Sequence, residues 1–574
     1  KTYFLQHKIM EEAVKNPKKD YIMIVPEQFT MQTQKDMIRI SPGHGIMNVD
    51  VQSFVRLAFR VFSETGAGNV QVLDDLGKIM ILKKVLSNKK DDLKYFGRNI
   101  NKDGYISEIK SFMSELIQYG ADENEIEKMI QASENKTVLK YKLQDMSVAF
   151  SAFKEYIDKN YITSEELLSV FADVISQSGL LNGAVICLDG FTGFTPLQYR
   201  LLRELIKIAE KVYITVTADE RESVINKGKN YQLFFMSRKT VNNIRLIASE
   251  TGVEVLDDIW TGKEISQTRF GSSKELEWLE RNLFRYPYKR YNNGKECEVS
   301  DISCHVLKYA EDEIDFVVQK IKRLLVNEGC RYRDIAIVAG SLETYGNIIE
   351  HAMKKAGIAC FIDQKRGVQS SVLVRAIDAL LQIIIKDFSY EDIMDYLKGC
   401  LSWTSDSQND ILDNYLLATG IRGFKAWNRE WNTSYAYRRM TDESKEFANG
   451  IVENVRLSVI ENLSGFYEKV AKGKHTVRDY ATALVEFFER QHFYEKLMEL
   501  ADDYEENENF DMASEYRQLY DMVIEVLEKL VSIMGDEEML LKEFKDILDV
   551  GFSEARIGVI PPGIDQVMAG DLSR

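Results

Sequence analysis

Proline is scarce in this sequence, at 7 of 574 residues, against about 5% in an average protein. Because proline interrupts helices, this scarcity indicates long helical segments. The sequence also lacks any apolar run near the ~18 residues that cross a membrane. The longest run, around residues 379–385, has the length of a buried core segment. We therefore expect a helix-rich globular protein that does not span a membrane.

Motifs for several kinds of site are missing as well. The six cysteines are scattered and form no CxxC pair, so we interpret them as reduced thiols of a cytoplasmic protein and expect neither a disulfide framework nor a zinc site. The histidines show no HxxxH or HExxH spacing, which disfavours a catalytic metal centre. No GxSxG motif of a serine hydrolase occurs.

The charge is acidic, because 74 basic residues face 90 acidic ones and leave a net charge of −16. This balance excludes a globally basic coat for nucleic acid, but it leaves a local basic channel possible. At ~150 residues per domain, the length corresponds to three or four domain-sized units. Since the chain starts at Lys1 without methionine and ends within an unfinished pattern, we expect a fragment.

Short apolar runs rich in β-branched residues predict buried strands, with helical patterns between them. This alternation indicates an α/β fold with parallel sheets. The predicted strands are residues 21–25, 46–51, 184–188, 212–217, 335–339 and 358–362.

Two long stretches, 74–181 and 389–548, show helical periodicity only, and we expect each to be an all-α insertion into an α/β domain. In the first stretch, Gly120 predicts a helix end, and Thr163 with Glu166 predicts a capping box. The domain parts outside the insertions are 1–73 with 182–300, and 301–388 with 549–574. Three tryptophans of the second insertion are expected in its core or facing a partner: Trp403, Trp427 and Trp431.

Two positions could take part in phosphate binding. Lys1 and Thr2 could end a GxxxxGK[ST] loop, in which the lysine reaches the phosphates and the hydroxyl binds Mg²⁺. Asp189 follows a buried strand, where such proteins place a carboxylate linked to Mg²⁺. The alternative for Asp189 is a turn or helix-cap residue, since a glycine-containing segment follows it.

Residues 25–30 and 53–60 each follow a predicted strand and combine aromatic with polar side chains. Aromatic faces with arginine nearby are typical of a surface that binds single-stranded nucleic acid. Arg56 and Arg60 lie one helical turn apart and could face a phosphate backbone. The alternative for the apolar positions Phe54, Leu57, Ala58 and Val61 is the buried face of an amphipathic helix.

Several ordered blocks together resemble the AddB/RexB family, the B subunit of the ATP-dependent helicase/deoxyribonuclease, which is related to superfamily 1 helicases. The most specific are the LDGF–FTP block, which begins at Leu188, and the IPPGIDQV–GDL block near residue 574. The other blocks are KTYFL, IVPEQFT, VQSFVRLAFRVF, VYITVTAD and RYRDIAIVAGSLETYGNIIEHAMKKAGIACFID.

The resemblance implies two RecA-like P-loop motor domains of the superfamily 1 helicase type, each with a large all-α insertion. It implies ATP and Mg²⁺ as cofactors, with Lys1, Thr2 and Asp189 at the nucleotide and Thr2 and Asp189 at the metal. It also implies DNA contacts that read a Chi sequence in the 3′ strand. The positions matching that channel are Gln28, Thr30, Phe54, Arg56 and Phe59.

For the whole protein, the resemblance implies processing of double-strand DNA breaks for recombinational repair, with an AddA-type helicase–nuclease subunit as the heterodimer partner and single- and double-stranded DNA ends as substrates. The nuclease domain and a 4Fe–4S cluster are expected outside this chain, which therefore carries no catalytic nuclease residues.

Two other functions remain open at this point. An active stand-alone helicase is disfavoured by Gly190, because active helicases usually carry a glutamate there to orient the attacking water. A non-enzymatic scaffold for AddA would suit the large helical insertions.

Overall fold

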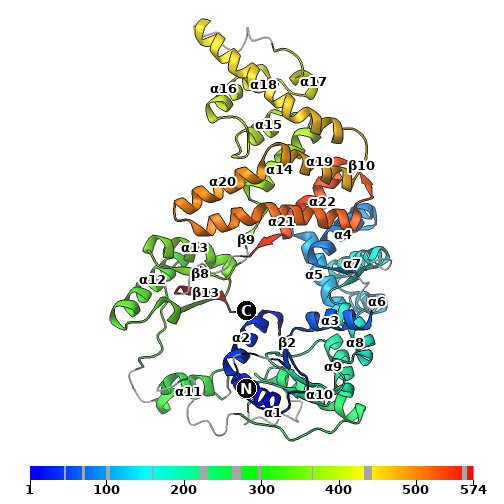
Figure 1. Ribbon diagram of the computed structural model, residues 1–574, viewed down its shortest axis with the longest axis vertical. Coiled ribbons are helices and arrows are strands. Elements are labelled where there is room, and N and C mark those ends of the chain that lie inside the picture. Colours follow the sequence, from blue (N-terminus) through cyan, green and yellow to red (C-terminus); the bar gives the residue numbers. More distant parts are fainter. Residues whose placement is uncertain are drawn as a thin grey trace. The chain divides into compact units, whose positions relative to one another are not determined.

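The computed structural model describes residues 1–43, 45, 47–66, 71–97, 104–157, 161–219, 229–261, 270, 273–285, 287–294, 299–364, 366–431, 442–558 and 565–572. The chain forms two compact units, which Figure 1 shows in sequence colours. The first unit contains residues 1–74, 91–96 and 108–305, and the second contains residues 75–90, 97–107 and 306–574.

The first unit is built on a four-stranded parallel sheet in the order β2-β1-β5-β6. All four strands were predicted, with ends that differ by at most three residues. Every residue of the central strands β1 and β5 is buried, as continuous apolar runs indicate. The strands are β1 (Tyr21–Ile24), β2 (Val49–Gln52), β5 (Val185–Leu188) and β6 (Lys211–Ile214).

Helices cover both faces of this sheet because successive side chains of a strand point to opposite faces. Met23 packs in a core with α1 (Thr2–Lys15) and α2 (Thr30–Ile40). Ile22 and Ile24 pack in the opposite core, which is formed by helices α3 (Phe54–Thr65), α8 (Leu167–Val174) and α9 (Pro196–Ile208).

The remaining elements of the first unit are mostly helical. The capping box is confirmed, since the Glu166 carboxylate accepts from the Thr163 backbone N–H at 3.0 Å, and the helix end at Gly120 (φ +70°) is confirmed as well. A parallel pair of three-residue strands was not predicted, because so few residues carry no periodicity. The elements are β3 (Gln71–Leu73), α5 (Tyr105–Gln118), α6 (Glu123–Ala132), α7 (Thr137–Ile157), β4 (Tyr161–Thr163), α10 (Phe235–Thr251) and α11 (Lys274–Asn282).

The second unit contains a three-stranded parallel sheet in the order β7-β13-β8. Its outer strands were both predicted from sequence, and the central strand comes from the other end of the unit. The elements are α12 (Ala310–Asn327), β7 (Ala336–Ala339), α13 (Leu342–Ala356), β8 (Cys360–Ile362) and β13 (Val567–Asp571). Of the late IPPGIDQV–GDL block, residues 559–564 lie outside the described residues.

The predicted second helical stretch, 389–548, is mostly helical, and its apolar core also contains residues that lie outside it, among them Met80, Leu373 and Phe552. Trp427 is fully buried in it, and Trp403 and Trp431 pack against it, so these tryptophans belong to the core. The helices are α14 (Val372–Ile385), α15 (Tyr390–Leu397), α16 (Asp406–Thr419), α17 (Phe424–Trp427), α18 (Asp442–Val470), α19 (Val477–Arg490), α20 (Phe493–Glu506), α21 (Phe510–Met534) and α22 (Leu541–Glu554).

One further helix and several short elements complete the two units. Helix α4 (Asp75–Asn88) joins the core of the second unit through Met80. Two antiparallel pairs also occur there, namely β9 (Arg366–Gly367) with β12 (Arg556–Ile557), and β10 (His475–Thr476) with β11 (Glu538–Met539). Short 3₁₀ helices are η1 (Glu27–Phe29), η2 (Lys90–Asp92), η3 (Ile175–Gln177), η4 (Tyr291–Gly294) and η5 (Tyr332–Asp334).

The fold is thus α/β with parallel sheets and mostly helical content, in agreement with the predicted class. Among the described helices, none has both the length and the apolar character needed to cross a bilayer.

Candidate functional site

The carboxyl ends of the four strands meet at one edge of the first sheet. The pairing register aligns the last residue of each strand, because Ile24 lies beside Gln52 and Leu188, and Leu188 lies beside Ile214. Residues that follow these strands therefore share the edge at which open α/β sheets bind ligands.

Asp189 lies buried at this edge, with 3% of its surface exposed. Its backbone N–H donates to the Ile24 carbonyl at 3.1 Å, and its carboxylate accepts a hydrogen bond from the hydroxyl of Thr215, which follows β6. The next helix, α9, is capped by Thr195 and makes no use of Asp189 as a cap. The thiol of Cys187 on β5 has a raised pKa, mainly because it is buried and also because Glu12 and Asp189 lie near it.

The turn after Asp189 closes tightly against η1. Gly190 has φ +84°, and a Cβ atom there would lie 3.3 Å from Cδ of Pro26 and 3.6 Å from Cδ2 of Phe29. An L-residue would be strained in this backbone conformation and would also crowd the proline ring. Position 190 is therefore shaped for glycine.

Lys1 and Thr2 lie at the start of α1 and are both exposed. The helix is held on the sheet by buried Leu5 and Ile9. No described hydrogen bond or ion pair joins either residue to Asp189. Among the described residues, no group of three or more histidine, cysteine, aspartate or glutamate side chains could hold a metal ion.

In the segment after β1, some side chains are exposed to solvent and others are buried. Gln28 is exposed, and Phe29 is 44% exposed. Thr30 is buried, and its hydroxyl donates to the Glu27 carbonyl at 2.9 Å, at the start of α2. Gln28 and Phe29 are thus available to a ligand at this edge, whereas the Thr30 hydroxyl is engaged within the protein.

Helix α3 begins after β2 with a cap at Ser53, whose hydroxyl accepts from the Arg56 N–H at 3.3 Å. Phe54 is buried, with its ring centroid 5.3 Å from that of Phe191. Phe59 is 45% exposed. The buried amphipathic face is confirmed, since it contains Phe54, Leu57, Ala58 and Val61.

Arg56 connects the segments that follow β1 and β2. Its Nε atom lies 2.8 Å from Oε1 of Glu27, and both side chains are more than half exposed. Arg60, one turn further along α3, pairs with Asp50 of β2. The sequence pattern identified Arg56 but missed Glu27 and Thr215. Both residues could have been found from their positions, because each closely follows a strand of the same parallel sheet.

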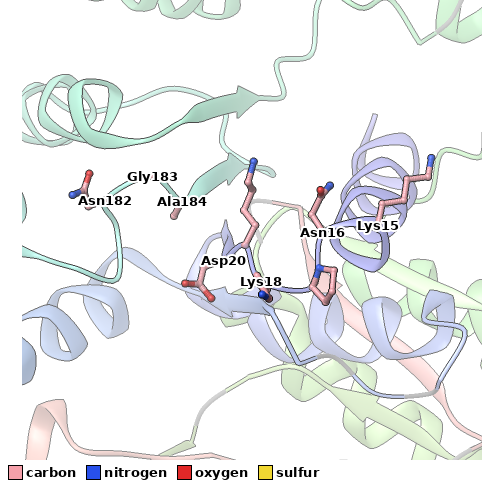
Figure 2. Close-up of a pocket in the computed structure, with 9 residues that line it drawn as sticks. Lys15, Asn16, Lys18, Asp20, Asn182, Gly183 and Ala184 are labelled. Atoms are coloured by element: carbon pink, nitrogen blue, oxygen red, sulfur yellow. The ribbon is translucent and has the colours of Figure 1, made fainter.

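A pocket of about 540 Å³ lies at the opposite edge of the sheet, as Figure 2 shows. It is lined by residues that precede β1 and β5, and one of them, Lys19, forms an ion pair with Glu210 at 2.6 Å. Because ligands of parallel sheets bind at the carboxyl edge, this pocket is separate from the candidate site. Its lining is Lys15–Asp20 and Asn182–Ala184.

Known proteins resemble this chain along its whole length. The family described as "ADDB, N-terminal" matches residues 1–280. Proteins named as B subunits of an ATP-dependent helicase/deoxyribonuclease align with all of the chain at 39% identity in Lachnoclostridium phytofermentans and 32% in Clostridium novyi and Acetivibrio thermocellus. The alignments cover 50%, 49% and 50% of those proteins, so the chain spans about half the length of these curated relatives. By these matches, the chain belongs to the AddB family of ATP-dependent helicase/deoxyribonuclease B subunits.

Proposed function

We propose that this chain is the helicase-like part of such a B subunit and that the carboxyl edge of its first sheet binds single-stranded DNA. The observation that carries the proposal is the ion pair between Arg56 and Glu27, which joins two segments that follow adjacent strands. Around it lie exposed groups of the kinds that bind a strand: an amide on Gln28 and aromatic rings on Phe29 and Phe59.

The ion pair also orients the guanidinium group. The Arg56 Nε–H donates to Glu27, which fixes one side of the planar group. The terminal amino groups then remain available for a phosphate or for the O6 and N7 edge of guanine. Exposed Phe29 and Phe59 can stack on bases. Two of the positions proposed to read Chi, Thr30 and Phe54, are buried. They would hold the exposed residues in place and would not contact the strand themselves.

Nucleotide binding is the second part of the proposal. Lys1 would contact phosphate oxygens, and Thr2 and Asp189 would hold Mg²⁺. One hydroxyl and one carboxylate suit this ion, which takes oxygen ligands and usually completes its shell with water and substrate phosphates. With Gly190 beside Asp189, no carboxylate orients an attacking water at that position, so hydrolysis would be slow. The same glycine disfavours a stand-alone helicase.

The role of the whole protein follows from the family. Relatives are named as B subunits of an ATP-dependent helicase/deoxyribonuclease. We propose that this protein acts with an AddA-type subunit on double-strand DNA ends during recombinational repair and reads Chi in the 3′ strand. The two sheets would belong to two RecA-like motor domains, and nuclease activity and a 4Fe–4S cluster would lie outside this chain.

Replacing Arg56 with alanine tests the strand-binding surface. We expect single-strand affinity to fall, and if Arg56 reads a base, the favoured sequence should lose about 1–3 kcal/mol more than random strands. The measurement is a competition assay with a set of labelled oligonucleotides.

Glu27→Gln is the matched variant for this assay. It removes a negative charge but also weakens the contact that orients the Arg56 guanidinium, so we expect tighter binding to all strands together with a smaller preference for the favoured sequence. A uniform loss in Arg56→Ala would make this residue a phosphate contact. Unchanged affinity in both variants would refute strand binding at this edge.

A further inference from the structure

A second surface of the first unit combines exposed tyrosines with lysines. It lies where residues 93–96 pack beside α7, in the helical part of the unit (Figure 1). We call Lys94, Tyr95, Tyr141 and Lys142 the tyrosine–lysine patch. None of these residues takes part in the site at the sheet edge.

A buried carboxylate fixes the backbone of the patch. Asp145 on α7 is 1% exposed and accepts three consecutive backbone N–H groups, from Lys94 at 2.8 Å, Tyr95 at 2.7 Å and Phe96 at 2.8 Å. Leu93 and Phe96 are buried on either side of the two outward-facing residues. The turn is therefore rigidly attached to the helix, and it holds Lys94 and Tyr95 at the surface.

The lysines and tyrosines pair reciprocally across this junction. Lys94 Nζ lies 5.8 Å from the ring centroid of Tyr141, and Lys142 Nζ lies 5.0 Å from that of Tyr95. Lys94 also donates to the Gln144 side chain at 3.2 Å. Because an ammonium group is attracted to the face of an aromatic ring, each ring restricts the motion of one lysine. Two cations are thus held in place above the surface.

The described residues offer these two cations no acidic partner. Neither Lys94 nor Lys142 is in a described ion pair, whereas Lys128 and Lys154 of the same helical region pair with glutamates. The nearby carboxylate of Asp145 is already occupied by backbone N–H groups. In a chain with a net charge of −16, two positioned cations without carboxylates are suited to an external anion.

We infer that the tyrosine–lysine patch binds the phosphodiester backbone of DNA, as a contact separate from the strand-binding edge. Each ring has one ammonium group over one of its faces. Because contacts from such cations to phosphates carry no sequence information, we expect binding without sequence preference. Duplex DNA presents about one phosphate per 1.7 Å of its axis, so it offers two neighbouring lysines more phosphates than a single strand does. The inference rests on the proposed function only in taking DNA as the nucleic acid.

The test compares two double variants of the intact chain that lose the same charge. Lys94→Ala/Lys142→Ala removes the patch, and Lys128→Ala/Lys207→Ala removes two lysines paired with Glu125 and Glu204. Affinity for a blunt duplex and for a single strand of equal length is measured against salt. For duplex DNA, each lost phosphate contact lowers the slope of log affinity against log salt concentration by about 0.9. We therefore expect this slope to fall by about 1–2 in the patch variant and to stay unchanged in the control.

Variants of the two tyrosines test the patch independently of the lysines. Tyr95→Phe/Tyr141→Phe keeps the ring faces and should bind the duplex like the wild type, whereas Tyr95→Leu/Tyr141→Leu should weaken it. Equal slopes for the patch and control variants would overturn the inference, as would a loss confined to the single strand. If the wild type binds single strands through Arg56 but the patch variants change nothing, only this inference fails. If the wild type binds no DNA, the proposed function fails too.

Discussion

Gly190 shows how one residue can fix the chemistry of a site. Its positive φ would strain any L-residue, and an added Cβ atom would lie 3.3 Å from Cδ of Pro26, so the proline ring would have to shift. A glutamate that orients water therefore requires a different turn after β5.

Gly190→Ala should destabilise the first sheet by about 1–3 kcal/mol, because backbone strain adds to crowding. Hydrogen exchange of the β1 and β5 amides measures this loss. Gly252→Ala is the matched control, since Gly252 has φ +71° but nothing within 4 Å of an added Cβ. Equal losses in the two variants would show that the Pro26 contact does not restrict this position.

The residues of the candidate site were only partly accessible to sequence reasoning. Gln28, Arg56 and Asp189 could be found because each follows a strand of a parallel sheet. Helical periodicity offered burial of Phe54 as an alternative, which the structure confirms. The burial of Thr30 was not predicted, because it depends on tertiary packing. The partner of Arg56 was equally hidden, since Glu27 lies 29 residues away in the sequence.

At the level of elements, the segment at residues 93–96 depends on α7 for its conformation. A single buried carboxylate satisfies three of its backbone N–H groups. Such charge-assisted hydrogen bonds are stronger than neutral ones. Much of the rigidity of this segment should therefore depend on Asp145.

Asp145→Asn should lower the local stability of this segment by about 1–3 kcal/mol, because a neutral amide with one acceptor oxygen replaces the carboxylate. Faster hydrogen exchange at Lys94, Tyr95 and Phe96 is the expected result. Asp122→Asn is the control, since Asp122 caps α6 by accepting from the Glu125 N–H at 3.0 Å. Unchanged exchange at the three amides would contradict the role given to Asp145.

Elements were predictable where the pattern was long enough. Continuous apolar runs identified six strands of the two parallel sheets, and helical spacing identified α5 up to Gly120. The pairs β3/β4, β9/β12 and β10/β11 were missed because strands of two or three residues show no periodicity.

At the level of the whole molecule, chain order and spatial grouping differ. Residues 75–90 and 97–107 belong to the second unit, although the segments on either side belong to the first. Met80 of α4 is fully buried in the second unit's core. Helical periodicity shows that a face is buried but not which core buries it, so this grouping could not be read from the sequence. The assignment to motor domains and insertions remains a proposal.

The net negative charge of the chain limits where DNA can bind. A net charge of −16 opposes general attraction to DNA, so any binding must come from restricted surfaces. The carboxyl edge of the first sheet and the tyrosine–lysine patch are the two surfaces of the first unit that we propose for this role. Each depends on a few cations with a defined environment.

We propose above all that the chain binds single-stranded DNA at the carboxyl edge of its first sheet. The most direct test is the affinity of the intact chain for a labelled single strand, measured by fluorescence anisotropy over a range of salt concentrations. We predict clear binding near 50 mM salt that falls steeply as salt increases, with a slope of about 0.7 per phosphate contact that is reduced in Arg56→Ala. No binding at about 50 mM salt would contradict the claim and favour a scaffold role.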